Sequence, residues 1–107
     1  MRVLDYIRIV GISDVCTLPP NSFQVTYTIE HSQDSNFHNP KRGVFTINLS
    51  DLIDIGSLDG GDVENLAACL NGHVLMRGKE EDGTISILHL LGLPLGDWLM
   101  KKRSLLD

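Results

Sequence analysis

The stretch that decides the fold is Phe23–Glu30, FQVTYTIE, in which apolar and polar residues alternate without a break. The apolar positions of this stretch are Phe23, Val25, Tyr27 and Ile29. Because successive side chains of a β-strand point to opposite faces, the alternation predicts a strand with one buried face and one solvated face. The chain is therefore expected to be built around a sheet that meets its core on one side.

Four other segments have the composition of strands. Residues 2–12, RVLDYIRIVGI, carry apolar positions on both faces, which is typical of a central strand packed on two sides. Gly11 permits a bend or bulge near the end of this strand, and Pro19-Pro20 stops it, because proline cannot donate a hydrogen bond to a ladder. The remaining strands are predicted at residues 44–49, 73–78 and 84–91.

A helix is expected between the third and fourth strands. Asp62 follows two glycines and is suited to cap a helix over residues 63–70, which Asn71-Gly72 would end. The apolar residues on one face of this helix are Val63, Leu66, Ala67 and Leu70. A short helical turn is expected earlier, over residues 51–55.

The order of elements predicts an α+β fold that is mainly antiparallel β. With 107 residues, the chain suits a single domain over residues 1–107. Five strands in the order β-β-β-α-β-β, followed by a C-terminal helix, form either an open curved sheet or a small barrel with OB-like topology. The sequence favours neither alternative.

The C-terminal segment, residues 94–107, is expected to contain a helix from Asp97 to about Leu106. Its apolar stripe consists of Trp98, Leu99, Leu105 and Leu106. Such a stripe either packs on the sheet or presents a surface to a protein partner or to a second copy, with Trp98 as the anchor. These four residues are the predicted partner-binding site.

The loop at residues 31–43 is the second candidate site. It spans 13 residues, which is long for a connection between adjacent strands, and long loops are often functional. An aromatic ring close to cations can stack a base and neutralise a phosphate, as single-strand binders do. The residues that would do so are Phe37, His38, Lys41 and Arg42.

The charge balance weighs against nucleic acid as the general ligand. Nine Lys and Arg against 14 Asp and Glu give a formal net charge of −5, whereas phosphate binding depends on clustered cations. No apolar run is long enough for a membrane span. The two cysteines, Cys16 and Cys69, lack C-x-x-C spacing and are expected to be small buried side chains of a cytoplasmic protein.

No motif for catalysis, a metal or a cofactor is present. The acidic residues between Asp51 and Glu64 do not follow the EF-hand pattern, and the four histidines lack ligand spacing. The sequence thus predicts a small, non-catalytic binding or adaptor domain of the cytoplasm whose partner is a protein, or itself. The alternative is an OB-like module for single-stranded nucleic acid that uses the 31–43 loop, and an enzyme ranks third.

Overall fold

The structure is a computed structural model that describes residues 2–18, 22–54, 58–83, 85–90 and 93–104, with backbone alone at Leu18 and over residues 85–90. Its elements are β1 (Arg2–Leu18), β2 (Ser22–Ser32), β3 (Lys41–Asn48), the 3-10 turn η1 (Leu49–Asp51), α1 (Gly60–Ala68), β4 (Val74–Lys79), β5 (Ile85–Leu90), β6 (Leu93–Pro94) and α2 (Leu95–Arg103). Among these described elements, the short β6 is the strand that the sequence analysis did not predict.

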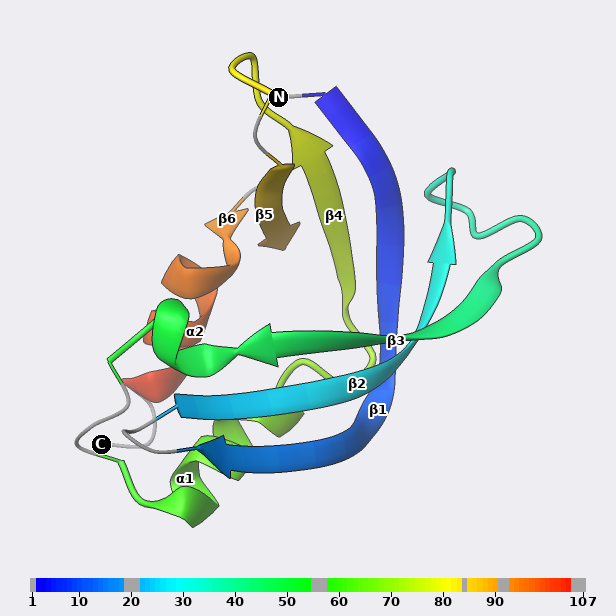
Figure 1. Cartoon of the computed structure of the whole chain (residues 1–107). Helices are drawn as coiled ribbons and strands as arrows, with labels where there is room; N and C mark the ends of the chain where they lie inside the picture. Colours follow the sequence, from blue (N-terminus) through cyan, green and yellow to red (C-terminus); the bar gives the residue numbers. More distant parts are fainter. Residues whose placement is uncertain (1, 19–21, 55–57, 84, 91–92, 105–107) are drawn as a thin grey trace.

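The strands form one sheet in the order β3-β2-β1-β4-β5-β6, in which every pair of neighbours is antiparallel. The predicted α+β fold with a mainly antiparallel sheet and a C-terminal helix is confirmed. The sheet is not closed, because β3 and β6 stand at its two ends (Figure 1). A barrel is therefore not shown.

The bend of the sheet comes from β1, which runs past its predicted end at residue 12 and continues to Leu18. Residues 2–8 of β1 pair with β4 and residues 6–18 pair with β2, and the register with β2 shifts between Ile9 and Gly11 and again between Ile12 and Asp14. The predicted bend or bulge at Gly11 is confirmed, and the strand continues through it to Leu18, directly before Pro19-Pro20 (Figure 1).

The core lies on one face of the sheet, and the helices cover that face. Ile7 and Ile9 of β1 are fully buried, whereas Val10, on the opposite face, is 46% exposed. The main core thus packs on one face of β1 alone. The opposite face, which the sequence analysis also expected to be packed, is half-buried at Leu4, Tyr6 and Arg8 and exposed at Val10. The predicted inward residues of β2, from Phe23 to Ile29, are all at most 5% exposed, as the alternation requires.

Helix α1 begins earlier than predicted. Asp59, not Asp62, is its N-cap, and the Asp59 carboxylate accepts a hydrogen bond from the Asp62 N–H at 2.7 Å. Both aspartates suit a cap, and the two glycines between them fit into the first helical turn, so the pattern did not distinguish them. The helix ends at Ala68, two residues before the predicted Leu70, and a turn leads from there to Gly72, whose φ is +82°.

Helix α2 begins at Leu95, two residues before the predicted Asp97, and ends at Arg103. A Cβ on Gly96 would lie 3.1 Å from the carbonyl oxygen of Leu52, so glycine allows the start of α2 to approach the chain after η1 closely. Leu105 and Leu106 lie outside the described residues.

Both cysteines are free thiols. The prediction that they are buried is wrong for both. Cys16 is exposed because it lies on the part of β1 that faces away from the core, and Cys69 is half-buried at the end of α1. In the described part of the chain, no helix is long and apolar enough to span a bilayer.

Candidate functional site

The edge strand β3 has one free side. All eight of its residues pair with β2, from Lys41 opposite His31 to Asn48 opposite Gln24. No other strand among the described residues pairs with it. The backbone N–H and C=O groups on its outer edge are therefore open to another extended chain.

A groove of about 170 Å³ runs beside this edge. The residues that line it are Phe45, Thr46, Ile47, Asn48, Asp51, Leu52 and Leu95. Phe45 and Ile47 lie opposite Tyr27 and Val25 of β2, and directly paired residues share a face, so the groove opens from the core side of the sheet. Its apolar wall lies at the edge of the sheet, between β3 and the start of α2.

Three different parts of the chain build the wall of this groove. Phe45 and Leu52 are half-buried, while Leu95 at the start of α2 is fully buried. The glycine at position 96 allows α2 to lie close to the Leu52 carbonyl, in the segment that follows η1. The groove thus lies at the junction of β3, η1 and α2, next to the free edge of β3.

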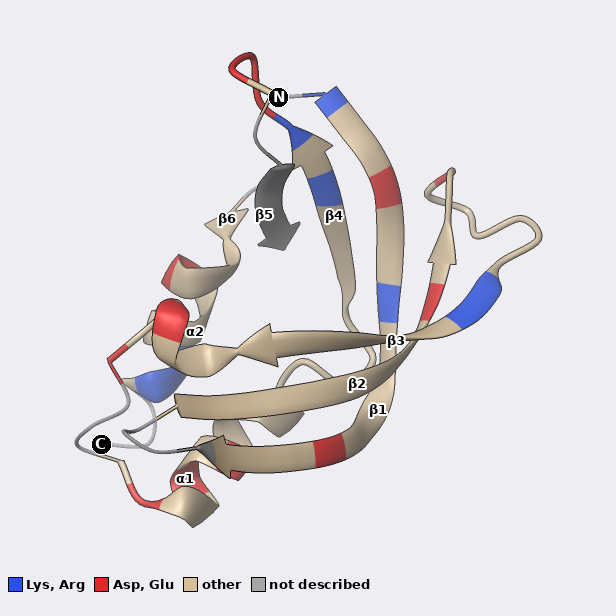
Figure 2. Ribbon diagram, viewed as in Figure 1, with Lys and Arg blue, Asp and Glu red and all other residues tan. Residues whose placement is uncertain are grey.

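Charge differs between the two ends of β3. Lys41 and Arg42 are both exposed at its start, and Asp51 is exposed in η1, directly after its end. Figure 2 shows basic residues at the first end and an acidic residue at the second. The open edge is therefore positive at one end, apolar in the middle and negative at the other end.

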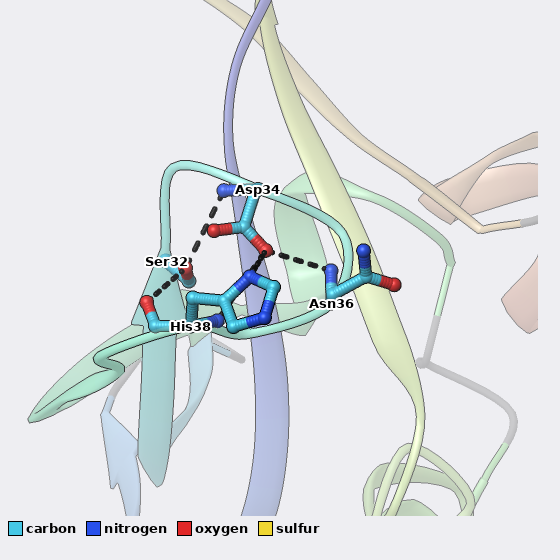
Figure 3. Close-up of polar contacts among 4 residues, drawn as sticks. All are labelled: Ser32, Asp34, Asn36 and His38. Atoms are coloured by element: carbon cyan, nitrogen blue, oxygen red, sulfur yellow. Dashed lines mark hydrogen bonds and ion pairs between the residues drawn. The ribbon is translucent and has the colours of Figure 1, made fainter.

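The loop before β3 is shorter than predicted, because β2 extends to Ser32 and β3 begins at Lys41. The Asp34 carboxylate accepts hydrogen bonds from the N–H groups of Asn36 at 2.9 Å and His38 at 3.3 Å (Figure 3). The Ser32 hydroxyl donates to the His38 carbonyl at 3.2 Å and accepts from the Asp34 N–H at 3.4 Å. The loop is thus ordered by its own polar contacts.

Phe37 lies under an arginine and not in an open binding surface. It is 7% exposed, and the Arg8 guanidinium stands 4.2 Å from the centre of its ring. Its φ of +55° turns the chain so that the ring meets the face of β1 opposite the core. In this conformation the ring has almost no accessible surface on which to stack a base.

The other residues of the predicted nucleic-acid site are exposed but lie on different elements, His38 in the loop and the two cations on β3. The His38 imidazole lies 3.4 Å from the Asp34 carboxylate, and Lys41 and Arg42 belong to β3. Arg42 is paired in register with Glu30, which also lies 3.6 Å from Arg8. Lys41 and Arg42 are consecutive residues of β3, so their side chains point to opposite faces of the sheet, and Arg42 shares the face of Glu30 and Arg8. The structure thus does not gather the predicted residues into one site.

Helix α2 directs its largest side chains inward. Trp98 is 7% exposed and Leu99 is fully buried, and both belong to the main core. The Trp98 ring lies 5.3 Å from the His73 ring and 5.2 Å from the Lys102 ammonium. Of the predicted partner-binding stripe, the two described residues therefore pack within their own chain.

An ion pair that the sequence analysis missed joins β1 and β4. The Arg77 guanidinium donates two hydrogen bonds to the Asp5 carboxylate, at 2.9 and 2.6 Å, and Asp5 is 7% exposed. These hydrogen bonds raise the pKa of Arg77 against the opposing effect of burial. The signal in the sequence was an aspartate inside an apolar strand, and such pairs are commonly structural.

Titratable side chains do not gather into a metal centre in the described residues, where no three His, Cys, Asp or Glu are close enough to hold an ion. Burial, and to a smaller extent Cys69, raises the pKa of Tyr27, whose hydroxyl donates to the Ala67 carbonyl at 2.8 Å. This hydroxyl is buried in the core, and the Ala67 carbonyl satisfies its hydrogen-bonding capacity as a donor.

Comparison with known proteins finds no match, whether to a protein-family model, to a curated sequence or to a solved structure.

Proposed function

We propose that this chain is a small, non-catalytic protein-binding domain that takes up an extended segment of its partner along the free edge of β3. The observation that carries the proposal is that this unpaired edge lies beside an apolar groove. An added strand gains main-chain hydrogen bonds from the edge, and alternate side chains of that strand find a pocket in the groove. The proposal keeps the predicted class of function and moves the contact from α2 to β3.

The proposal favours a protein over a nucleic acid. Phe37 is buried under Arg8, and Glu30 lies opposite Arg42, so the cations at the start of β3 have an acidic neighbour and no exposed ring beside them. Single-stranded nucleic acid on an OB-like half-barrel stays the alternative hypothesis. We propose the cytoplasm as the compartment, because an exposed free thiol such as Cys16 persists in a reducing environment.

Selection of short random peptides on the isolated chain tests the proposal. We expect the selected peptides to shift the NMR signals of the amides in residues 41–48. Methylating alternate backbone nitrogens of a peptide in one phase should abolish binding, and in the other phase should spare it, because only alternate N–H groups of an added strand face β3.

Phe45→Ala, which removes one wall of the groove, should weaken peptide binding. The matched control is Val10→Ala, which removes a 46% exposed apolar side chain elsewhere on the sheet and should not weaken it. A selection that yields no such peptide, or peptides that leave the signals of residues 41–48 unchanged, would contradict the proposal.

A further inference from the structure

We infer that the strand taken up by the β3 edge is β3 of a second copy, so that two chains pair antiparallel about a twofold axis. This inference rests on the proposed function, since it names the partner of the same edge. An antiparallel pair of identical strands is symmetric by construction and presents the same surface on both sides.

The charges at the two ends of β3 support the antiparallel arrangement. Lys41 stands at the start of the strand, and Asp51 follows its end. At about 3.3 Å per residue, the length of β3 keeps these side chains roughly 20 Å or more apart within one chain, too far for an ion pair. When two copies run antiparallel, Lys41 of each meets Asp51 of the other.

The same charges disfavour other occupants. A parallel arrangement of two copies would place Lys41 beside Lys41 and Asp51 beside Asp51. A foreign strand would need an acidic residue at one end and a basic residue at the other, with apolar side chains between them, and this chain already carries that pattern. The edge is therefore complementary to itself.

Apolar surface in the middle of the edge has the same consequence. Val44 is 68% exposed, which is the largest exposed fraction among the exposed large hydrophobic residues of the described part of the chain. In the antiparallel register that joins Lys41 to Asp51, Thr46 lies on the twofold axis, Val44 lies opposite Asn48 of the second copy, and the open side of the groove is covered. Both changes remove apolar surface from water.

The pair is expected to be weak. One strand-to-strand contact buries less area than a standard stable interface, and each copy carries a formal net charge of −5. Salt at physiological strength screens the overall repulsion beyond about 8 Å while the close pairs remain. We therefore expect dimers at micromolar to near-millimolar concentration.

Sedimentation equilibrium of the full chain tests the inference with two charge reversals. Lys41→Asp alone places two carboxylates opposite each other at each end of the pair, and Asp51→Lys alone places two ammonium groups there. Each variant should therefore dimerise about tenfold or more weakly than wild type. The Lys41→Asp chain carries a carboxylate at both positions, and the Asp51→Lys chain carries an ammonium group at both. In an equimolar mixture, the mixed pair therefore joins a carboxylate to an ammonium group at each end, and both contacts are favourable again. The mixture should regain dimers that neither variant forms alone.

Met100→Glu serves as the matched control, because Met100 is 47% exposed on α2, away from β3. It should leave the dimer unchanged, and loss of the dimer in this variant would place the contact on α2 and overturn the inference. A wild-type monomer at every concentration, or a mixture that stays monomeric, would also overturn it. Peptide selection on the β3 edge then decides separately whether the proposed function survives with a different partner.

Discussion

The neighbouring strands β2 and β3 differ in what surrounds them, although they are paired over the whole of β3. On β2, the side chains that face the core are at most 5% exposed from Phe23 to Ile29. On β3, the core-facing Ile47 is buried but the core-facing Phe45 is only half-buried, while Val44, which pairs with Thr28 on the outward face, is 68% exposed. The difference between Phe45 and its buried partner Tyr27 follows from position, since β2 has a strand on each side and β3 has a strand on one side alone.

The helices sharpen this difference. Figure 1 shows that α2 lies beside the end of β3, and that the start of β3 projects away from both helices with the loop. The inner residues of β2 belong to the same buried core as the helix side chains, and on β3 the fully packed member of that core is Ile47, in the second half of the strand. A strand's alternation thus predicts which face is buried, whereas the order of strands in the sheet decides which edge is available for binding.

The largest expected effect comes from placing the same charge on each strand. Val25→Asp buries an unpaired carboxylate at a fully buried position and should cost several kcal/mol, enough to unfold a domain with a typical stability of about 5–15 kcal/mol. Val44→Asp, at an exposed position of β3, should cost less than about 1 kcal/mol. Urea unfolding followed by circular dichroism measures both, and equal costs would refute the contrast between the strands.

A smaller effect is expected at α2, which covers the core face that β2 helps to build. Trp98→Ala empties a 7% exposed position and should lower the free energy of unfolding by about 3–5 kcal/mol without changing the oligomeric state. Met100→Ala, at an exposed position of the same helix, is the control and should cost far less. If Trp98→Ala instead dissociated a dimer at unchanged stability, the predicted partner surface on α2 would be restored.

The Tyr27 hydroxyl is expected to contribute about 1 kcal/mol. Tyr27→Phe leaves the buried Ala67 carbonyl without the hydrogen bond that it now accepts at 2.8 Å, and such a loss costs about 1–1.5 kcal/mol. The pKa of Tyr27 is raised in the folded chain, first by burial. The contribution of Tyr27 to the free energy of unfolding is therefore fully present below pH about 10, the pKa of an unfolded tyrosine. It declines as the pH rises above that value, because the tyrosine of the unfolded chain loses its proton first.

Unfolding of wild type and Tyr27→Phe between pH 8 and pH 11 measures this contribution. The decline above pH about 10 should be shallower in Tyr27→Phe, since the raised group is gone. An identical decline in both proteins would mean that Tyr27 ionises as easily in the folded state as in the unfolded one.

Much of the fold was predictable because it is encoded locally. The alternation in Phe23–Glu30 and the helical spacing of Val63, Leu66, Ala67 and Leu70 both identify a buried face without reference to the rest of the chain. The continuation of β1 to Leu18 was not predictable in this way, because a bulge at Gly11 and a strand end look alike in sequence. Pairing with β2 decides between them.

The candidate site was less predictable, because it depends on residues far apart in sequence. The ring of Phe37 is covered by Arg8, and no local pattern links the two positions. The free edge of β3 follows from β1 pairing with β4 instead of β3 closing the sheet, which is a property of the whole topology. The apolar stripe of α2 was identified correctly, but the sequence did not show that Trp98 packs inward.

The smallest expected effect concerns the solvated face that β2 and β3 share. The Thr26 and Thr46 hydroxyls lie 2.9 Å apart and are exposed, so each returns to water when the other is removed, and Val keeps the β-branched shape that strands favour. Thr26→Val, Thr46→Val and the double variant should each change the free energy of unfolding by less than about 0.5 kcal/mol at low protein concentration, with a coupling of the same size. Urea unfolding of the four proteins measures the cycle.

A coupling above about 1 kcal/mol would mean that this face is shielded from water, and repeating the cycle at higher protein concentration shows whether a second chain supplies the shielding. A coupling that grows with concentration would place Thr46 in the contact between copies, whereas a constant one would locate the shielding within the chain.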